Sequence, residues 1–474
     1  MAEKTEATVL VEKATNAPKE KVSSLFAWSH ATSVSGTAML IAAIIGSYFS
    51  VYMTDTMMIP AAAASMIMFV ATLWDAINDP MMGVIADRTK SRWGRYRPYF
   101  VVAPILLTIF GTLIWLNPDF STNGKIIYVL LTYIGYGMTV TMYTMPQMAI
   151  LPAHVKTDEQ RNRVIMMGAG ATAVMFTIGS SFTPQMKAFF EGAFGVSNGY
   201  IPLMIVLGLI SCISFWGLFA TGKEKYIAPV SDTSVWGDMK KILRHKELTP
   251  FVVVWIMASM GYGLMFASSV FYVMYYLVRP DLISVYMLVV SMGALVSMVV
   301  LMPICLRIFK TAQKTLVVTQ LIAIACYVTL FFVGNKNMML LYVITFIATS
   351  VASMSNALVN VLVNDAIDYV QFKDGISANG VISSIKGFAQ KCGNTVTNSG
   401  ILAVLAWAGY RAGEIGNQPA STMFAINFLR FGAPAIIGGI LLIALRFNPV
   451  EKHRADIQAM KDLIRDHSED NHEV

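Results

Sequence analysis

Residues 201–219 read IPLMIVLGLISCISFWGLF and contain no charged side chain. As an α-helix rising 1.5 Å per residue they would extend about 28 Å, close to the roughly 30 Å hydrocarbon core of a bilayer. Comparable apolar runs recur along the chain, for example at 126–150, 339–351 and 436–445 with their flanks. We therefore expect the chain to cross a membrane many times.

The overall composition supports this interpretation. The chain has 474 residues, of which 56% are hydrophobic and 13% charged, against about 25% charged in soluble domains. The charged N-terminal segment lacks the apolar core of a cleavable secretory signal, so the first hydrophobic helix must direct insertion. The net charge of +7 does not form one basic stripe with interleaved aromatics, which argues against a nucleic-acid partner. The four cysteines lack metal-site spacing and are expected to be inert.

Twelve apolar stretches of about 20 residues predict membrane-spanning helices. They lie at 25–54, 60–86, 98–116, 126–151, 164–187, 201–221, 251–278, 285–307, 315–334, 339–366, 379–408 and 421–446. An even number places both termini on one side. Lysine and arginine concentrate in alternate loops, most clearly at 88–97, 156–163, 223–246 and 307–314. Because basic loops stay in the cytoplasm, we predict cytoplasmic termini and a bacterial inner-membrane location.

A long polar stretch, Thr221 to Pro250, divides the predicted helices into six and six. The expected organisation is a cytoplasmic tail (1–24), a six-helix bundle (25–221), a central cytoplasmic loop (222–250), a second bundle (251–446) and a second tail (447–474). Charged residues follow the fourth and the tenth predicted helices alike, at 158–163 and 365–374. The predicted fold class is an all-α membrane protein of twelve helices in two pseudo-repeats, the major facilitator architecture.

Ionisable groups inside a membrane are costly and therefore mark candidate functional sites. The second predicted helix carries Asp75, Asn78 and Asp79, spaced so that three oxygen-bearing side chains share one face, and Pro80 follows directly. Such a set suits a hard cation such as Na⁺, and the two carboxylates can equally share a proton. The alternative is a structural salt bridge to a basic residue on a neighbouring helix.

The stretch WDAINDPMMGVIADRTKSRWGRYRP at 74–98 resembles the diagnostic segment of the glycoside–pentoside–hexuronide:cation symporter family. Further matches lie at 52–55, 146–152, 365–373 and 391–393, so the resemblance spans both halves. It implies a symporter that imports a sugar, glycoside or hexuronide with Na⁺ or H⁺. It also implies that Asp75, Asn78 and Asp79 bind the cation together with the Thr141 hydroxyl.

The substrate-binding positions match less well. The family's first-helix lysine and aspartate fall on Ala38 and Met39, its fourth-helix aspartate on Thr144 and its fifth-helix arginine on Ala169. Lys391 matches the eleventh-helix lysine. The candidate substrate residues are Lys391, Lys386, Thr144, Tyr143, Asn394, Asn398 and Trp255.

The two lysines favour an anionic sugar such as a glucuronide, because ammonium groups bind carboxylates. Alternatively, Lys391 pairs with Asp75 or Asp79 and Lys386 extends toward the cytoplasm. Aromatic residues near the expected cavity, including Tyr143 and Trp255, either stack on a sugar ring or pack between helices.

Several charges are expected to form a cytoplasmic gate that pairs across the halves when the protein faces outward, or else only to fix topology. The gate candidates are Asp87, Arg88, Arg95, Arg161, Arg163, Asp365 and Asp368. Arg430 is expected to be an interfacial or structural charge near the outer end.

The competing functions are a membrane enzyme, a transporter-like sensor and a symporter for a non-sugar solute. No catalytic histidine cluster or phosphate-binding loop supports an enzyme. We expect a monomer in the lipid bilayer, with no cofactor beyond the coupling ion.

Overall fold

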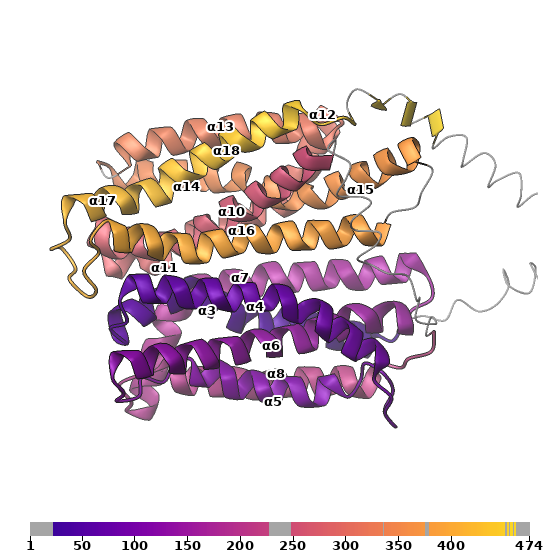
Figure 1. Cartoon of the computed structure of the whole chain (residues 1–474), viewed down its shortest axis with the longest axis horizontal. Coiled ribbons are helices and arrows are strands. Elements are labelled where there is room, and N and C mark those ends of the chain that lie inside the picture. The colour runs from indigo at the N-terminus through magenta and orange to yellow at the C-terminus, as the bar shows by residue number, and fades with distance from the viewer. Residues whose placement is uncertain are drawn as a thin grey trace, which may run out of the picture.

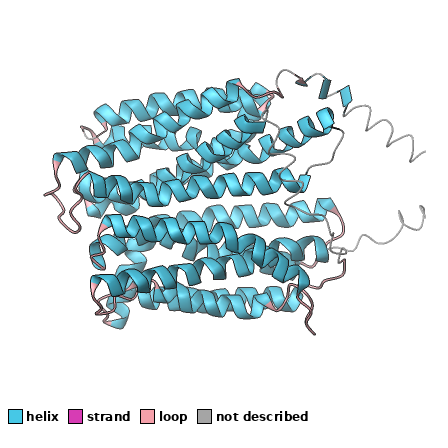
Figure 2. Cartoon of the chain, in the orientation of Figure 1, coloured by secondary structure: helices cyan, strands magenta, loops and turns pink. Residues whose placement is uncertain are grey.

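The computed structural model describes residues 22–226, 248–334, 336–374, 379–450 and most of 453–460. The greater part of the predicted central loop and of both predicted tails lies outside these residues. Every regular element in the described part is helical (Figure 2).

The helices follow one another as twelve helical segments, which we call rods; some rods consist of several consecutive helical elements. In the first half they are α2 Ser24–Thr32 with η1 Ser33–Ala38, α3 Met39–Val51 and η2 Tyr52–Thr56; α4 Ala61–Arg88; α5 Tyr99–Leu113; α6 Thr122–His154; α7 Asp158–Phe194; and α8 Tyr200–Thr221. In the second half they are α10 Thr249–Phe271 with η4 Tyr272–Tyr276; η5 Pro280–Leu282 with α11 Ile283–Val296, η6 Ser297–Leu301 and α12 Met302–Phe309; α13 Ala312–Val333; α14 Met338–Ala352 with α15 Met354–Asp374; α16 Asn379–Trp407; and α17 Ala420–Asn427 with η7 Phe428–Gly432 and α18 Ala433–Arg446.

Ten of these rods are long and apolar enough to cross a membrane by length and composition. The other two are α5, which is apolar but has only 15 residues, and α16, which carries Lys386, Lys391 and many amide and hydroxyl groups. A rod lined with polar groups is tolerated in a bilayer when it faces protein or a water-filled cavity. This tolerance accounts for α16, whereas α5 differs only in its length, and a short apolar helix is accommodated by local thinning of the bilayer.

Three predicted helix boundaries are wrong by six to eight residues: the start and end of the fifth helix, predicted at 164 and 187 but found at 158 and 194, and the end of the tenth, predicted at 366 but found at 374. The fifth rod, α7, begins at Asp158, six residues before the predicted start, so the charges at 158–163 form its first turns rather than a loop. The tenth rod continues through α15 to Asp374, which places Asp365 and Asp368 inside a helix. Hydropathy marks only the apolar part of a helix, whereas the backbone hydrogen bonds continue beyond it. Acidic residues at a helix N-terminus are also favoured by the helix dipole.

The rods form two bundles of six (Figure 1). The halves meet where α4 packs on α16, α7 on α11 and α3 on α10. The first rod of each half ends in the same way: a π-helical turn (η2 or η4) precedes a non-glycine residue with left-handed backbone, Met58 at φ 57° or Val278 at φ 55°. The next amide bonds back to Met53 in the first half and to Val273 in the second. This shared irregularity is what two repeats of one ancestral unit would show.

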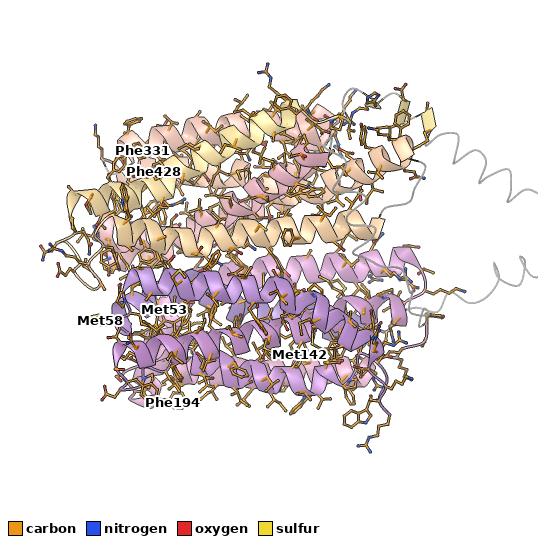
Figure 3. All side chains as sticks on the ribbon, viewed as in Figure 1. Met53, Met58, Met142, Phe194, Phe331 and Phe428 are labelled. Carbon is orange, nitrogen blue, oxygen red and sulfur yellow. The ribbon has the colours of Figure 1, made fainter. Side chains whose placement is uncertain are left out.

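The two ends of the molecule differ. Phe26 stacks on His154 with ring centroids 3.9 Å apart, and the amides of Lys225 and Tyr226 donate to the Ala153 carbonyl at 2.8 Å. The first described residues and the segment that follows α8 therefore lie at the same end of the molecule, and α18 also ends there (Figure 1). We call this the terminal end. Met58 lies at the opposite end, beyond the buried Met53 (Figure 3).

Of the two expectations for Arg430, an interfacial charge or a structural one, the structure supports the structural charge. Its side chain is 0% exposed, its Nε donates to the Tyr286 hydroxyl at 2.9 Å, and its guanidinium lies over the rings of Tyr286 and Phe431. Ring faces and a phenol oxygen take the place of water around this charge. The sequence alone does not reveal the rotation of the twelfth rod that turns Arg430 inward.

Candidate functional site

The charged centre of the molecule lies where α4 of the first half meets α16 of the second. Lys391 on α16 forms an ion pair with Asp79 and donates to the backbone carbonyl of Asp75 at 2.9 Å. Thr141 on α6 donates to the other carboxylate oxygen of Asp79 at 2.7 Å. Three of the four residues predicted to bind the cation, Asp75, Asp79 and Thr141, are therefore joined to Lys391 directly or through Asp79, and Asn78 is buried on the same helix, α4. We call Asp75, Asn78, Asp79 and Thr141 the oxygen cluster.

The oxygen cluster contains polar atoms that the fold leaves unsatisfied. Asp75 Oδ1 and Asn78 Nδ2 are buried without a hydrogen-bond partner among the described residues. An unpaired buried carboxylate oxygen is costly, because it has lost its hydration without compensation. Two carboxylates, an amide and a hydroxyl supply the hard oxygen donors that Na⁺ prefers, or a shared-proton site. The residues present therefore fit a small cation as transported substrate.

Gly137 is a part of this site that the sequence analysis missed. It lies one turn before Thr141 on α6, and a Cβ added there would overlap Asp75 Oδ1. The absence of a side chain at this position thus lets α6 approach the Asp75 carboxylate. The i, i+4 spacing to Thr141 is the sequence signal that could have identified it. Elsewhere in the described chain, no three His, Cys, Asp or Glu side chains gather as a metal group.

A separate cavity of about 710 Å³ lies between the halves near the terminal end. Its walls come from the first rod, α6 and α7 on one side and from α10, α11, η6 and α15 on the other. No Asp, Glu, Lys or Arg is among its described lining residues. Met39 and Ala169, which occupy positions of charged substrate-binding residues in the resembling family, both line it. The cavity therefore lies where the resemblance implies a solute site, but without that site's charges.

None of the seven predicted substrate residues lines this cavity. Trp255 and Tyr143 are buried, and Tyr143 packs on Phe215. The Thr144 hydroxyl donates to the carbonyl of Val140 one turn earlier. On α16, Lys391 is held at the oxygen cluster, Lys386 and Asn398 are half-buried, and Asn394 is exposed. The sequence analysis also missed His30, Gln147 and Asn360, which do line the cavity.

Two of the predicted gate charges, Asp87 and Arg161, make contacts within the first half. The Tyr96 hydroxyl donates to Asp87 at 2.9 Å, and burial with this hydrogen bond raises the pKa of Tyr96, so that its proton stays in place. Arg161 donates to the carbonyl of Val155 just after α6. Asp365 and Asp368 project from α15, whereas Arg88, Arg95 and Arg163 belong to the first half. Pairing across the halves remains a prediction.

At the opposite end the halves are joined by polar contacts. Asp55 of η2 accepts hydrogen bonds from Tyr275 of η4 and, at 2.5 Å, from Tyr410 after α16. Nearer the centre, Ser180 of α7 bonds to Ser291 of α11 at 2.7 Å. Ser291 also lines the cavity. The cavity is therefore closed toward the opposite end by these contacts and lies toward the terminal end.

Comparison with known proteins agrees with this architecture. The model of a family described as MFS/sugar transport protein matches residues 32–452. The chain belongs to this family. It is 26% identical to the isoprimeverose transporter of Lactiplantibacillus pentosus, over 90% of this chain and 89% of that one. It is 24% identical to the glucuronide carrier protein homolog of Escherichia coli (strain K12), over 83% and 85%.

Among solved structures, the fold matches a bacterial homolog of the human lysosomal transporter Spinster with a TM-score of 0.64. The sequences are 13% identical, and the match covers 90% of this chain and 95% of that one. Together with the match to the MFS family model, this likeness shows the major facilitator fold. The resemblance to the glycoside–pentoside–hexuronide:cation symporters is likewise confirmed, and the chain is a membrane transporter rather than an enzyme.

Proposed function

We propose that this protein is a symporter that imports a sugar or glycoside with a cation bound at the oxygen cluster. The observation that carries the proposal is Lys391 of the second half, held by Asp79 and Asp75 of the first. An ammonium in this position neutralises a half-buried carboxylate when no transported cation is present. A cation that enters the cluster must displace Lys391, and so changes a contact between the two halves.

This displacement gives a physical route to coupling. Two sites are coupled when each ligand favours the same global state, and their coupling free energy is shared. Displacing Lys391 weakens one inter-half contact, and a sugar bound between the halves supplies others. Cation and sugar together then favour closure around the cavity, while either alone leaves contacts unmade. The basic loops favour a cytoplasmic terminal end, so the cavity as observed would face the cytoplasm.

We further propose that Na⁺ is the coupling ion, because the cluster includes the neutral oxygens of Asn78 and Thr141 as well as two carboxylates. A proton needs only one carboxylate, whereas Na⁺ needs several oxygen ligands. Accumulation of radiolabelled glycosides in vesicles, driven either by a Na⁺ gradient or by a pH gradient, tests both proposals. Uptake driven by pH and indifferent to Na⁺ would refute the choice of ion. Failure of either gradient to concentrate any glycoside would refute the function.

A further inference from the structure

The polar groups of the cavity gather at a break in the first rod. Between α2 and α3 the backbone passes through the π-helical turn η1, in which Gly36 leaves helical geometry with φ −99° and ψ −108°. Ser35 of this turn lines the cavity, as does His30 one turn before it. The Ser33 hydroxyl donates to the carbonyl of His30 at 3.1 Å and so helps to end α2. Broken helices in transporters are found where a solute is bound.

Gln147 of α6 faces this break and is held by His30. His30 Nε2 lies 3.3 Å from the backbone carbonyl oxygen of Gln147, and His30 Nδ1 lies 3.3 Å from its side-chain Nε2. A carbonyl only accepts, so Nε2 of the imidazole carries the proton and Nδ1 accepts from the amide. Only the neutral imidazole satisfies both contacts in this arrangement. The pair therefore adds no charge to the cavity and fixes the orientation of the Gln147 amide.

The fixed amide leaves one acceptor and one donor for a ligand. Within the described chain, no hydrogen bond engages Gln147 Oε1 or the second hydrogen of its amide nitrogen. A carboxamide with one free acceptor and one free donor matches adjacent hydroxyl groups, each of which both donates and accepts. Across the cavity, Phe176 of α7 and Tyr262 of α10 have ring centroids 6.5 Å apart. These rings offer apolar faces to a sugar ring, and Asn360 offers a second amide.

We propose that Gln147, positioned by His30, is the specificity-determining residue for the transported solute and selects an uncharged sugar over the corresponding sugar acid. The cavity offers a carboxylate no Lys or Arg partner, and burying an unpaired carboxylate is far more costly than burying a hydroxyl that finds an amide. Lys391, the cation expected from the sequence to receive such a carboxylate, is not among the residues that line the cavity. This inference rests on the proposed sugar symport and names its substrate class.

The test uses the full-length protein in proteoliposomes with an inward Na⁺ or pH gradient. The probes are methyl glycosides of the gluco, galacto and xylo series, together with the methyl glucuronide and galacturonide that match the first two. The proposal expects the neutral glycosides to be concentrated in preference to their uronides. It also expects Gln147→Ala to raise KM for the preferred glycoside roughly tenfold, the size of one or two lost hydrogen bonds.

His30 positions Gln147, and substitutions of His30 should therefore have a distinct kinetic effect. His30→Ala should raise KM severalfold with kcat nearly unchanged, and His30→Asn should restore part of the affinity because its side-chain oxygen still accepts from the Gln147 amide. Gln320→Ala removes another buried amide, in α13, that is not among the residues lining this cavity, and should leave KM unchanged. If Gln147→Ala fails to reach the membrane, Gln147→Asn tests the same contact by shortening the amide.

The outcomes separate the inference from the function on which it rests. Gradient-driven uptake that prefers a uronide, or an unchanged KM in the Gln147 variants, overturns the inference and leaves sugar symport standing. Equal rises in KM for Gln147→Ala and Gln320→Ala also overturn it, because they would reflect general damage to the fold. No concentrative uptake of any glycoside overturns the proposed function itself.

Discussion

The contact between α4 and α16 and the cavity beside the first rod differ in one respect above all. The first gathers two carboxylates and an ammonium from opposite halves, whereas the second is lined by described residues without formal charge. The difference separates two tasks. The charged contact is suited to responding to a cation, and the neutral cavity to recognising hydroxyl groups. If this division is correct, substitutions at the two places should have different kinetic signatures.

The largest effect is expected from Asp79→Asn. This change leaves Lys391 facing an amide and removes the carboxylate shared by Thr141 and Lys391. The ion pair is half-buried, so Lys391 loses a partner in surroundings with limited access to water and the cation loses a carboxylate ligand. Gradient-driven accumulation should therefore be abolished. Exchange of sugar across the membrane without a gradient should persist, because the cavity is untouched. Unchanged concentrative uptake at equal expression would remove Asp79 from the coupling role, and Asp75→Asn is judged by the same criterion.

A smaller effect is expected from Gly137→Ala. The added methyl group overlaps Asp75 Oδ1, so the carboxylate must rotate or α6 must move away. The cation concentration for half-maximal uptake should rise severalfold, while KM for sugar at saturating cation stays near the wild-type value. Gly170→Ala is a suitable control, because a Cβ there meets nothing within 4 Å. Equal effects of the two substitutions would show that Gly137 has no special relation to Asp75.

The smallest effect is expected from Thr141→Ala. One hydrogen bond to Asp79 is lost, worth about 0.5–1.5 kcal/mol or somewhat more because its acceptor is charged. The apparent affinity for the cation should fall between about twofold and tenfold, and Thr141→Ser, which keeps the hydroxyl, should retain most of it. A loss as large as that of Asp79→Asn would mean that Thr141 does more than complete the ligand set.

The sequence can predict features that depend on residue type and spacing within one helix. The spacing of Asp75, Asn78 and Asp79 along a single helix predicts that they share one face, and in the structure Thr141 of α6 donates a hydrogen bond to Asp79. The sequence alone could not decide whether Lys391 pairs with the solute or with a carboxylate of the protein, because that depends on how α4 and α16 pack. Whether a residue such as Gln147 lines a cavity depends on how its helix is rotated about its axis and on the break at η1. Neither feature can be read from the composition of the sequence.

The central claim is that Lys391 occupies the place of the transported cation, and equilibrium Na⁺ binding to the purified protein tests it most directly. If the ammonium competes with Na⁺ for the oxygen cluster, Lys391→Ala should bind Na⁺ more tightly than the wild type, by roughly tenfold or about 1.4 kcal/mol. Asp79→Asn, as the control, should show no measurable binding. Na⁺ affinity that is unchanged or weaker in Lys391→Ala, together with weakened binding of a uronide but not of its neutral glycoside, would contradict the claim and assign Lys391 to the solute.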